Sequence, residues 1–486
     1  MHAMLRTGPS GARFFAALVL ATGLAVPGAG RADSRERCPA SAALPALPPA
    51  RFDDGPTIAP AALAQDLDAW LAGLNGINPD PARRADPALI GREAARIRAQ
   101  LTHPMTRREA WLLFATLNPY LNDGHAGIVM PNYREALAAH LKAGGRIVPL
   151  EVRFGRDGSL RVFDAAPGPL RRGDQLLAVN GRDVETLLAA MSALAIGDTP
   201  GSRRAFLERR FAMLYGYLYG YLYGDTSDYD VSVRREPSGC SMTVRLPGGT
   251  HLPQALEPDP SAQELFAWRV LPGNVGYLRV DAFASPLKGE FEALTHEAFA
   301  TFRARRVRAL IIDVRENGGG DDPLWQQDLV NHFTTRPYVQ LSHYAQRVMP
   351  DNADPGDVIG AVRSADYDQR FTPPPQDPVR FDGPVYVLGG PYSYSATIQF
   401  MVAAQDFHLA RIAGEETAAL ACQSGQVRRI GLAWSGLSAT TPLIAYTRPS
   451  GQGCTRGVLP DVAIPIDEVD PDATLEALRE WILRHG

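Results

Sequence analysis

The spacing of apolar residues divides the chain into three regions, and the first of them is helical. Over residues 61–142 apolar side chains recur every three or four positions, which predicts amphipathic helices. One helix has a recognisable start, since Thr106 and Glu109 form a capping-box pattern ahead of an apolar run. This N-terminal helical domain ends in the turn Asp123-Gly124-His125, and residues 33–60, rich in proline and alanine, form an extended lead-in.

The second region, residues 143–250, has the pattern of a β-rich module. Residues 147–154 and 160–163 are strand-like and are joined by a hairpin signal, and a second tight turn is marked by Asn180-Gly181. Residues 215–224 repeat tyrosine and glycine so that a glycine recurs every fourth position. On a helix these glycines would form a smooth stripe suited to packing against a neighbouring domain; a substrate-contacting aromatic surface is the alternative.

The third region, residues 265–486, alternates strands with helices. Its strands are continuously apolar, as Leu310-Ile311-Ile312 illustrates, which is typical of strands covered by helices on both faces. The alternation predicts a layered α/β domain, closed by a helix over residues 475–483.

The start of the chain has the pattern of a secretory signal. Arg6 and Arg13 precede an apolar run over residues 14–26, and small residues follow as far as Ala32. The run of 13 residues is shorter than the ~20 that a membrane-spanning helix needs. We therefore expect a signal peptide over residues 1–32 and a soluble mature protein that is secreted across the inner membrane into the periplasm.

Composition narrows the possible partners and the redox state. The net charge of −4 gives no basic footprint for nucleic acid, and lysine occurs only at positions 142 and 288. Four cysteines in an oxidising compartment suggest disulfides. Cys422 and Cys454 flank one β-rich stretch and are the first pair to expect; four isolated, reduced cysteines are the alternative.

Two loops of the third region have the composition of a reaction site. Residues 318–320 are three glycines that follow a buried strand, so their backbone can approach a ligand closely. Ser395 follows the strand at residues 385–388 and precedes a helix, where a serine Oγ can be exposed near helical N–H groups. A plain helix N-cap is the alternative interpretation of Ser395.

Taken together, these segments resemble the S41 family, the tail-specific or C-terminal-processing peptidases. The resemblance rests on the glycine loop Leu310–Gly320, on the segment Pro384–Ser395 with Ala413-Gly414-Glu415 after it, and on Asp123-Gly124-His125-Ala126, which is similar to the histidine motif of the tricorn-like branch. It implies an α/β fold whose layered catalytic core, at 265–486, is built of crotonase-like β/α repeats. The module at 143–250 would be an inserted PDZ-like domain.

The resemblance also implies roles for individual residues. Ser395 would be the nucleophile, with Ser393 as fallback, because Asp406 then falls where the family's core helix ends. The backbone N–H groups of Gly319 and Ala396 would form the oxyanion hole. Leu420 stands where one branch carries a lysine base, so a serine–lysine dyad is not expected and His125 becomes the base.

The orienting acid stays open at this point. Gly124 stands where the tricorn-like branch has a serine, and Cys454 stands near its glutamate. Asp123, Glu415 and Glu416 are the candidate substitutes.

These residues predict an exported serine-type peptidase that hydrolyses peptide or protein substrates and needs no metal or organic cofactor. Two alternatives use the same fold. One is a catalytically impaired protein that binds a peptide or a lipophilic ligand, and the other is an esterase using the same site.

Overall fold

The computed structural model describes residues 44–47, 55–129, 133–165, 168–209, 218–251 and 260–485. The expected signal peptide and most of the expected lead-in lie outside these residues. In the described ranges, no helix is long and apolar enough to cross a membrane.

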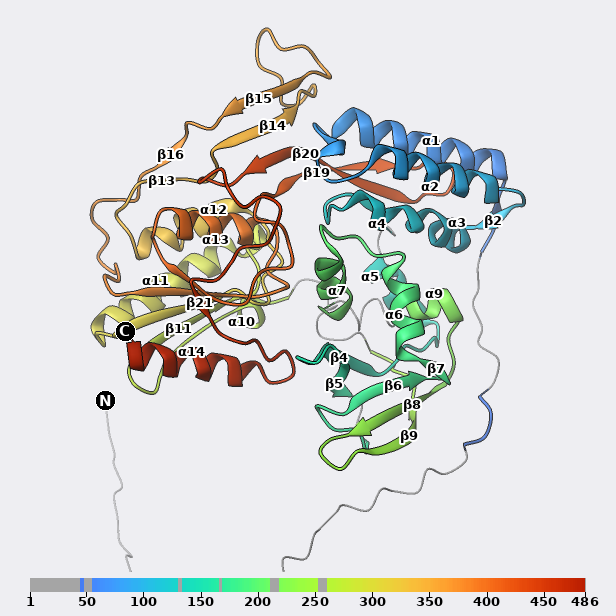
Figure 1. Ribbon diagram of the computed structural model, residues 1–486, viewed down its shortest axis with the longest axis horizontal. Coiled ribbons are helices and arrows are strands. Elements are labelled where there is room, and N and C mark those ends of the chain that lie inside the picture. Colours follow the sequence, from blue (N-terminus) through green and yellow to red (C-terminus); the bar gives the residue numbers. More distant parts are fainter. Residues whose placement is uncertain are drawn as a thin grey trace, which may run out of the picture. The chain divides into compact units, whose positions relative to one another are not determined.

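A six-stranded sheet organises the C-terminal region (Figure 1). Its order is β10 (Phe266–Leu271), β11 (Val275–Val280), β12 (Ala309–Asp313), β17 (Val385–Gly389), β18 (Arg411–Gly414) and β21 (Val462–Ala463). All neighbouring pairs are parallel except β10 with β11. Parallel strands end at one common edge of the sheet, and the two loops singled out above follow β12 and β17 at that edge.

Helices cover both faces of this sheet, which explains its continuously apolar strands. Leu310 and Ile312 belong to a core shared with α11 (Lys288–Ala304), α12 (Asp322–Gln327) and α13 (Ala396–Asp406). Ala309 and Ile311 point to the other face and pack with α14 (Pro471–His485). The expected layered α/β architecture is confirmed.

A second sheet joins a strand of the N-terminal region to strands of the C-terminal region. It runs β15 (Val362–Asp366), β14 (His343–Arg347), β20 (Ser438–Thr447) and β19 (Ser424–Gly431), and β3 (Gly127–Val129) pairs with β20. The N-terminal helices are α1 (Pro60–Ile77), α2 (Pro87–Gln100), α3 (Arg107–Phe114) and α4 (Asn118–Leu121), with a 3-10 turn at Pro81–Arg83. Helix α1 packs on β19 and β20, and the capping box of Thr106 and Glu109 starts α3 as expected. These helices therefore share a core with C-terminal strands.

The middle region forms a third, antiparallel sheet. Its order is β4 (Leu150–Phe154), β5 (Leu160–Ala165), β6 (Gln175–Val179), β8 (Asp228–Arg235) and β9 (Cys240–Pro247), and β7 (Arg182–Asp183) pairs with β6. Asn180 and Gly181 both have positive φ, as the expected tight turn between β6 and β7 requires. Helices α6 (Val184–Ser192) and α7 (Pro200–Arg209) lie against this sheet.

The remaining elements are short. The strand pairs are β1 (Thr57–Ile58) with β2 (Met105–Thr106) and β13 (Tyr338–Val339) with β16 (Arg370–Phe371). The helices are α5 (Tyr133–Lys142), α9 (Gly220–Tyr223) and α10 (Ala262–Leu265).

The described half of the tyrosine–glycine repeat serves packing. Residues 215–217 lie outside the described ranges, whereas Tyr219 is buried and meets Tyr229 edge-on. Tyr221 meets Trp111 of α3, with ring centroids 5.8 Å apart. The contacts favour the packing interpretation over a substrate-contacting surface.

The cysteines in the described ranges are oxidised, whereas Cys38 lies outside them. Cys422 and Cys454 form the disulfide that was expected first. Cys240 is also disulfide-bonded. The alternative of isolated, reduced cysteines is wrong for these three residues.

Candidate active site

Ser395 sits in a strained turn between β17 and α13. Its φ of 55° and ψ of −123° are unfavourable for a residue with a Cβ, and such strain is characteristic of functional sites. The Ser395 hydroxyl makes no capping bond to the helix that follows, so the N-cap interpretation fails. The side chain is instead half-exposed and free to meet a partner from another segment.

Ser393 has a structural role. Its side chain is fully buried, and its Oγ donates to the carbonyl of Val314 and accepts from the N–H of Gly390. These two bonds hold the turn after β17 against the loop after β12. The geometry thus separates the fallback serine from Ser395.

His125 reaches Ser395 from a turn 270 residues earlier in the sequence. Its Nε2 lies 3.1 Å from the Ser395 Oγ, within hydrogen-bond range. The turn that carries His125 follows α4 and leads directly into β3, which pairs with β20. The shared sheet therefore fixes the position of the imidazole relative to the C-terminal strands.

The glycine loop after β12 packs directly against the serine. Asp313 and Arg315 form a buried two-pronged ion pair that shapes its first residues. Gly319 has a φ of 107°, and a Cβ on it would lie 2.7 Å from the Cβ of Ser395. Only glycine fits this close approach.

The two expected oxyanion donors differ in the structure. The N–H of Ala396, at the start of α13, has no hydrogen-bond acceptor among the described residues. The N–H of Gly319 instead donates to the Asn317 Oδ1 at 2.9 Å, which closes a local turn. In this structure the Ala396 amide is therefore open to an oxyanion, whereas the Gly319 amide is engaged by the Asn317 side chain.

Among the candidate orienting acids, the structure brings only Asp123 to His125. The Asp123 Oδ1 lies 3.6 Å from His125 Nδ1. The carboxylate of Glu415 accepts from the backbone N–H of Ile466, and that of Glu416 binds Arg456. Glu415 thus binds the backbone just after β21, and Glu416 binds the loop between β20 and β21, so the structure places neither of them as the orienting acid.

Two hydroxyl groups that the sequence did not single out lie closer to His125 than Asp123 does. Ser424 Oγ and Tyr394 Oη each lie 3.0 Å from His125 Nδ1. Ser424 is the first residue of β19, and Tyr394 precedes the nucleophile. The adjacency of Tyr394 to Ser395 was the one sequence signal for either residue.

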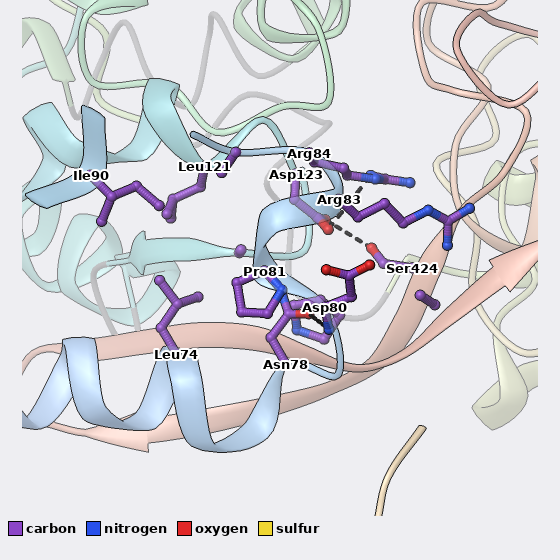
Figure 2. Close-up of a pocket in the computed structure, with 14 residues that line it drawn as sticks. Leu74, Asn78, Asp80, Pro81, Arg83, Arg84, Ile90, Leu121, Asp123 and Ser424 are labelled. Atoms are coloured by element: carbon purple, nitrogen blue, oxygen red, sulfur yellow. Dashed lines mark hydrogen bonds and ion pairs between the residues drawn. The ribbon is translucent and has the colours of Figure 1, made fainter. Parts of the chain in front are cut away.

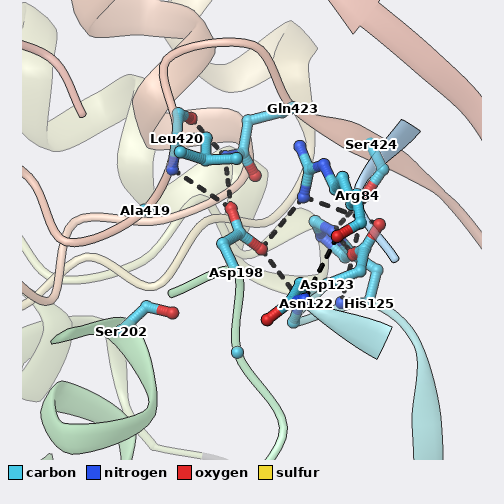
Figure 3. A network of polar contacts seen from close by, with 12 residues as sticks. Arg84, Asn122, Asp123, His125, Asp198, Ser202, Ala419, Leu420, Gln423 and Ser424 are labelled. Carbon is cyan, nitrogen blue, oxygen red and sulfur yellow. Dashed lines mark hydrogen bonds and ion pairs between the residues drawn. The ribbon is translucent and has the colours of Figure 1, made fainter. Parts of the chain in front are cut away.

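A buried charged network lies behind these hydroxyls (Figure 3). Arg84 Nη1 lies 3.1 Å from Asp198 and 3.5 Å from Asp123, and all three side chains are at most 8% exposed. Asp198 accepts further bonds from the N–H of Gly124, the N–H of Leu420 and the amide of Gln423. Arg84 and Asp198 are thus further site residues that sequence reasoning missed.

Burial and charge together set the protonation of this network. Burial alone would raise the pKa of Asp123, but the Arg84 guanidinium and bonds from His125 hold that pKa well below its usual value. Burial, together with the charges of Asp198 and Asp123, raises the pKa of Tyr394 well above its ordinary value. Asp123 is therefore ionised and the Tyr394 phenol keeps its proton at neutral pH.

Comparisons with known proteins agree with this architecture. Residues 274–464 match the model of peptidase family S41. The structure of mature CPAF complexed with lactacystin has a TM-score of 0.62 and 17% identity, over 87% of this chain and 97% of that one. The structure of mature CPAF alone has a TM-score of 0.61 and 17% identity, over 87% of this chain and 95% of that one. No curated protein matches the sequence. The match over residues 274–464 supports an S41 family peptidase.

Proposed function

We propose that this S41 peptidase is a serine peptidase in which Ser395 attacks the scissile carbonyl and His125 takes the hydroxyl proton. The observation that carries the proposal is the 3.1 Å contact between His125 Nε2 and the strained, half-exposed Ser395. A neutral imidazole is a suitable base for a serine hydroxyl near pH 7. The imidazolium would then return the proton to the leaving amine, and water would release the acyl group by the same route.

The Ala396 amide is the first oxyanion donor in this proposal. It follows the nucleophile directly and begins α13, where backbone N–H groups point out of the helix end. Gly319 would supply a second donor once its N–H leaves the Asn317 side chain. Substrate binding is the step at which this exchange would occur.

We further propose that the protein works after export, in the periplasm. The oxidised Cys422–Cys454 pair supports this, because disulfides persist in oxidising compartments. The basic and apolar start of the chain is the second support.

The middle module would present peptide substrate in the manner of a PDZ-like domain. Strand β4 lies at one end of its sheet, and a groove of about 760 Å³ opens between the end of β4, α2, α6 and α7. Its walls carry both apolar and charged groups, including Phe154, Tyr120 and Arg203. An edge strand beside a mixed groove is an arrangement that can hold an extended peptide segment.

Hydrolysis assays test the proposed reaction. The mature protein is incubated with an unfolded protein substrate and, separately, with a chromogenic ester, beside a Ser395→Ala variant. We expect cleavage of both substrates by the wild type and of neither by the variant. Ester cleavage without peptide cleavage would indicate an esterase, and a folded wild type that cleaves nothing would indicate a binding protein.

A further inference from the structure

The imidazole of His125 has two hydroxyl groups on the side away from Ser395. Ser424 Oγ and Tyr394 Oη both lie 3.0 Å from Nδ1. The two hydroxyls come from separate segments, the start of β19 and the turn before α13. The Tyr394 ring also packs on the imidazole, with centroids 4.8 Å apart.

Each hydroxyl already donates its single proton to a carboxylate. Ser424 Oγ donates to Asp123 at 2.8 Å, and Tyr394 Oη donates to Asp198 at 3.0 Å. Each can therefore offer His125 only a lone pair. Both contacts are hydrogen bonds only if the ring proton sits on Nδ1. Nε2 is then left with the lone pair that faces Ser395.

We propose that Ser424 and Tyr394 are paired positioning residues that hold His125 in the tautomer required of a base, each backed by its own buried carboxylate. This inference rests on the proposed function of Ser395 and His125. It assigns the orienting role to two hydroxyl-bridged arms, His125–Ser424–Asp123 and His125–Tyr394–Asp198, in place of a single directly bonded acid.

The charges of the network suit this role. Every contact of Asp198 described above donates to its oxygens, as expected for an ionised carboxylate. Asp123 and Asp198 together carry two negative charges, and Arg84 carries one positive charge. The cluster has one negative charge in excess. When His125 accepts the Ser395 proton, the imidazolium neutralises that excess in a buried site.

The surrounding space is shaped for the two arms. A Cβ on Gly124 would lie 2.4 Å from the Tyr394 hydroxyl, so a glycine next to His125 makes room for that arm. Behind Asp123 and Ser424 lies a cavity of only about 20 Å³, bordered by Asp80, Arg83 and Arg84 (Figure 2). Such a cavity holds about one water molecule, too little to screen the carboxylates as bulk solvent would.

The position of the imidazole proton tests the proposal directly. The mature protein is labelled with ¹⁵N-histidine, and the His125 signals are assigned by their loss in His125→Gln. We expect the neutral ring to carry its proton on Nδ1 in the wild type and in each of Ser424→Ala and Tyr394→Phe. In the double variant the population should shift toward the Nε2 proton. A wild-type ring protonated on Nε2, or a folded double variant that keeps the Nδ1 proton unchanged, would overturn the proposal.

Reaction rates provide a second readout. Because either arm alone holds the ring, each single variant should slow fluorophosphonate labelling of Ser395 less than about tenfold. In the double variant the labelling rate should fall by about 10²- to 10³-fold, within the range that a general base contributes. Ser424→Thr keeps a hydroxyl, so in the Tyr394→Phe background it should label at the rate of the Tyr394→Phe single variant and not at that of the double variant with Ser424→Ala. Single losses that simply multiply in the double variant would contradict the shared role.

The two readouts separate the inference from the proposed function. A ring protonated on Nδ1 in a folded wild type that takes no label would refute the serine peptidase mechanism and leave the two arms in place. Normal labelling of Ser395 with a ring protonated on Nε2 would support the serine peptidase mechanism and refute the role of the two arms. Tyr344→Phe, on β14 two strands from β19, is the matched control and should alter neither readout.

Discussion

Replacing Gly124 by alanine should displace the Tyr394 arm. The added Cβ would stand 2.4 Å from the Tyr394 hydroxyl, 2.8 Å from its Cζ and 3.1 Å from a ring carbon of Phe206. Ordinary contact begins near 3.4 Å, so the hydroxyl must move by about 1 Å. Its bonds to His125 and Asp198, both 3.0 Å long, would then exceed hydrogen-bond length.

The magnitude follows from two opposing terms. Overpacking of a buried site costs about 1–3 kcal/mol of unfolding free energy. Replacing glycine by alanine restricts the unfolded chain and returns about 0.4–1 kcal/mol. We therefore expect Gly124→Ala to lower the free energy of unfolding by at most about 2.6 kcal/mol in urea titrations. It should slow labelling of Ser395 about as much as Tyr394→Phe does, because both remove one arm.

A matched glycine and a double variant sharpen this test. A Cβ added to Gly91 in α2 would meet no atom within 4 Å, so Gly91→Ala should raise stability by about 0.5–1 kcal/mol and leave labelling unchanged. Adding Gly124→Ala to Tyr394→Phe should slow labelling little further. If Gly124→Ala labels at the wild-type rate, or if its effect multiplies with that of Tyr394→Phe, the assigned role of the arm is refuted.

Three further perturbations have expected outcomes. Removing the Cys422–Cys454 disulfide, which spans 32 residues, should lower the free energy of unfolding by about 3–4 kcal/mol, measured in urea without reductant. Burial raises the pKa of Asp281 to about 8 despite Arg279, so the folded state binds this proton more tightly and stability falls between about pH 4 and 8. The free energy of unfolding of Asp281→Asn, taken relative to that of the wild type in urea titrations, should therefore rise by about 2–6 kcal/mol from pH 4 to pH 9. A difference between the two proteins that does not change with pH would contradict this. Gly319→Ala would force a Cβ to 2.7 Å from that of Ser395 and should slow labelling at least about 100-fold in a protein that still folds.

The parts of the site that the sequence predicted are those marked by local pattern. Ser395 follows a buried strand and begins a helix, and its strained turn is a local property of that junction. His125 was found because it lies in a short turn motif and because no lysine follows Lys288. The layered core was predicted for a similar reason, since burial on both faces leaves a continuous apolar run in each strand.

The positioning network could not be predicted in the same way. Ser424, Asp198 and Arg84 come from three distant segments, and their polar side chains are ordinary in each local context. The pairing of β3 with β20, which also pairs with β19, brings the His125 turn near the start of β19. The engagement of the Gly319 amide could not be predicted either, because the turn formed by the Asn317 side chain depends on a side-chain rotamer that the glycine pattern does not reveal.

The central claim is that Ser395 is a nucleophile activated by His125, and fluorophosphonate labelling followed by peptide mapping tests it most directly. The wild type, Ser395→Ala and His125→Gln are compared, with folding of each checked by its urea midpoint. The account predicts a label on the peptide that contains Ser395, none in Ser395→Ala, and greatly slowed labelling in His125→Gln. A label on another serine, or a folded wild type that takes none, would contradict it.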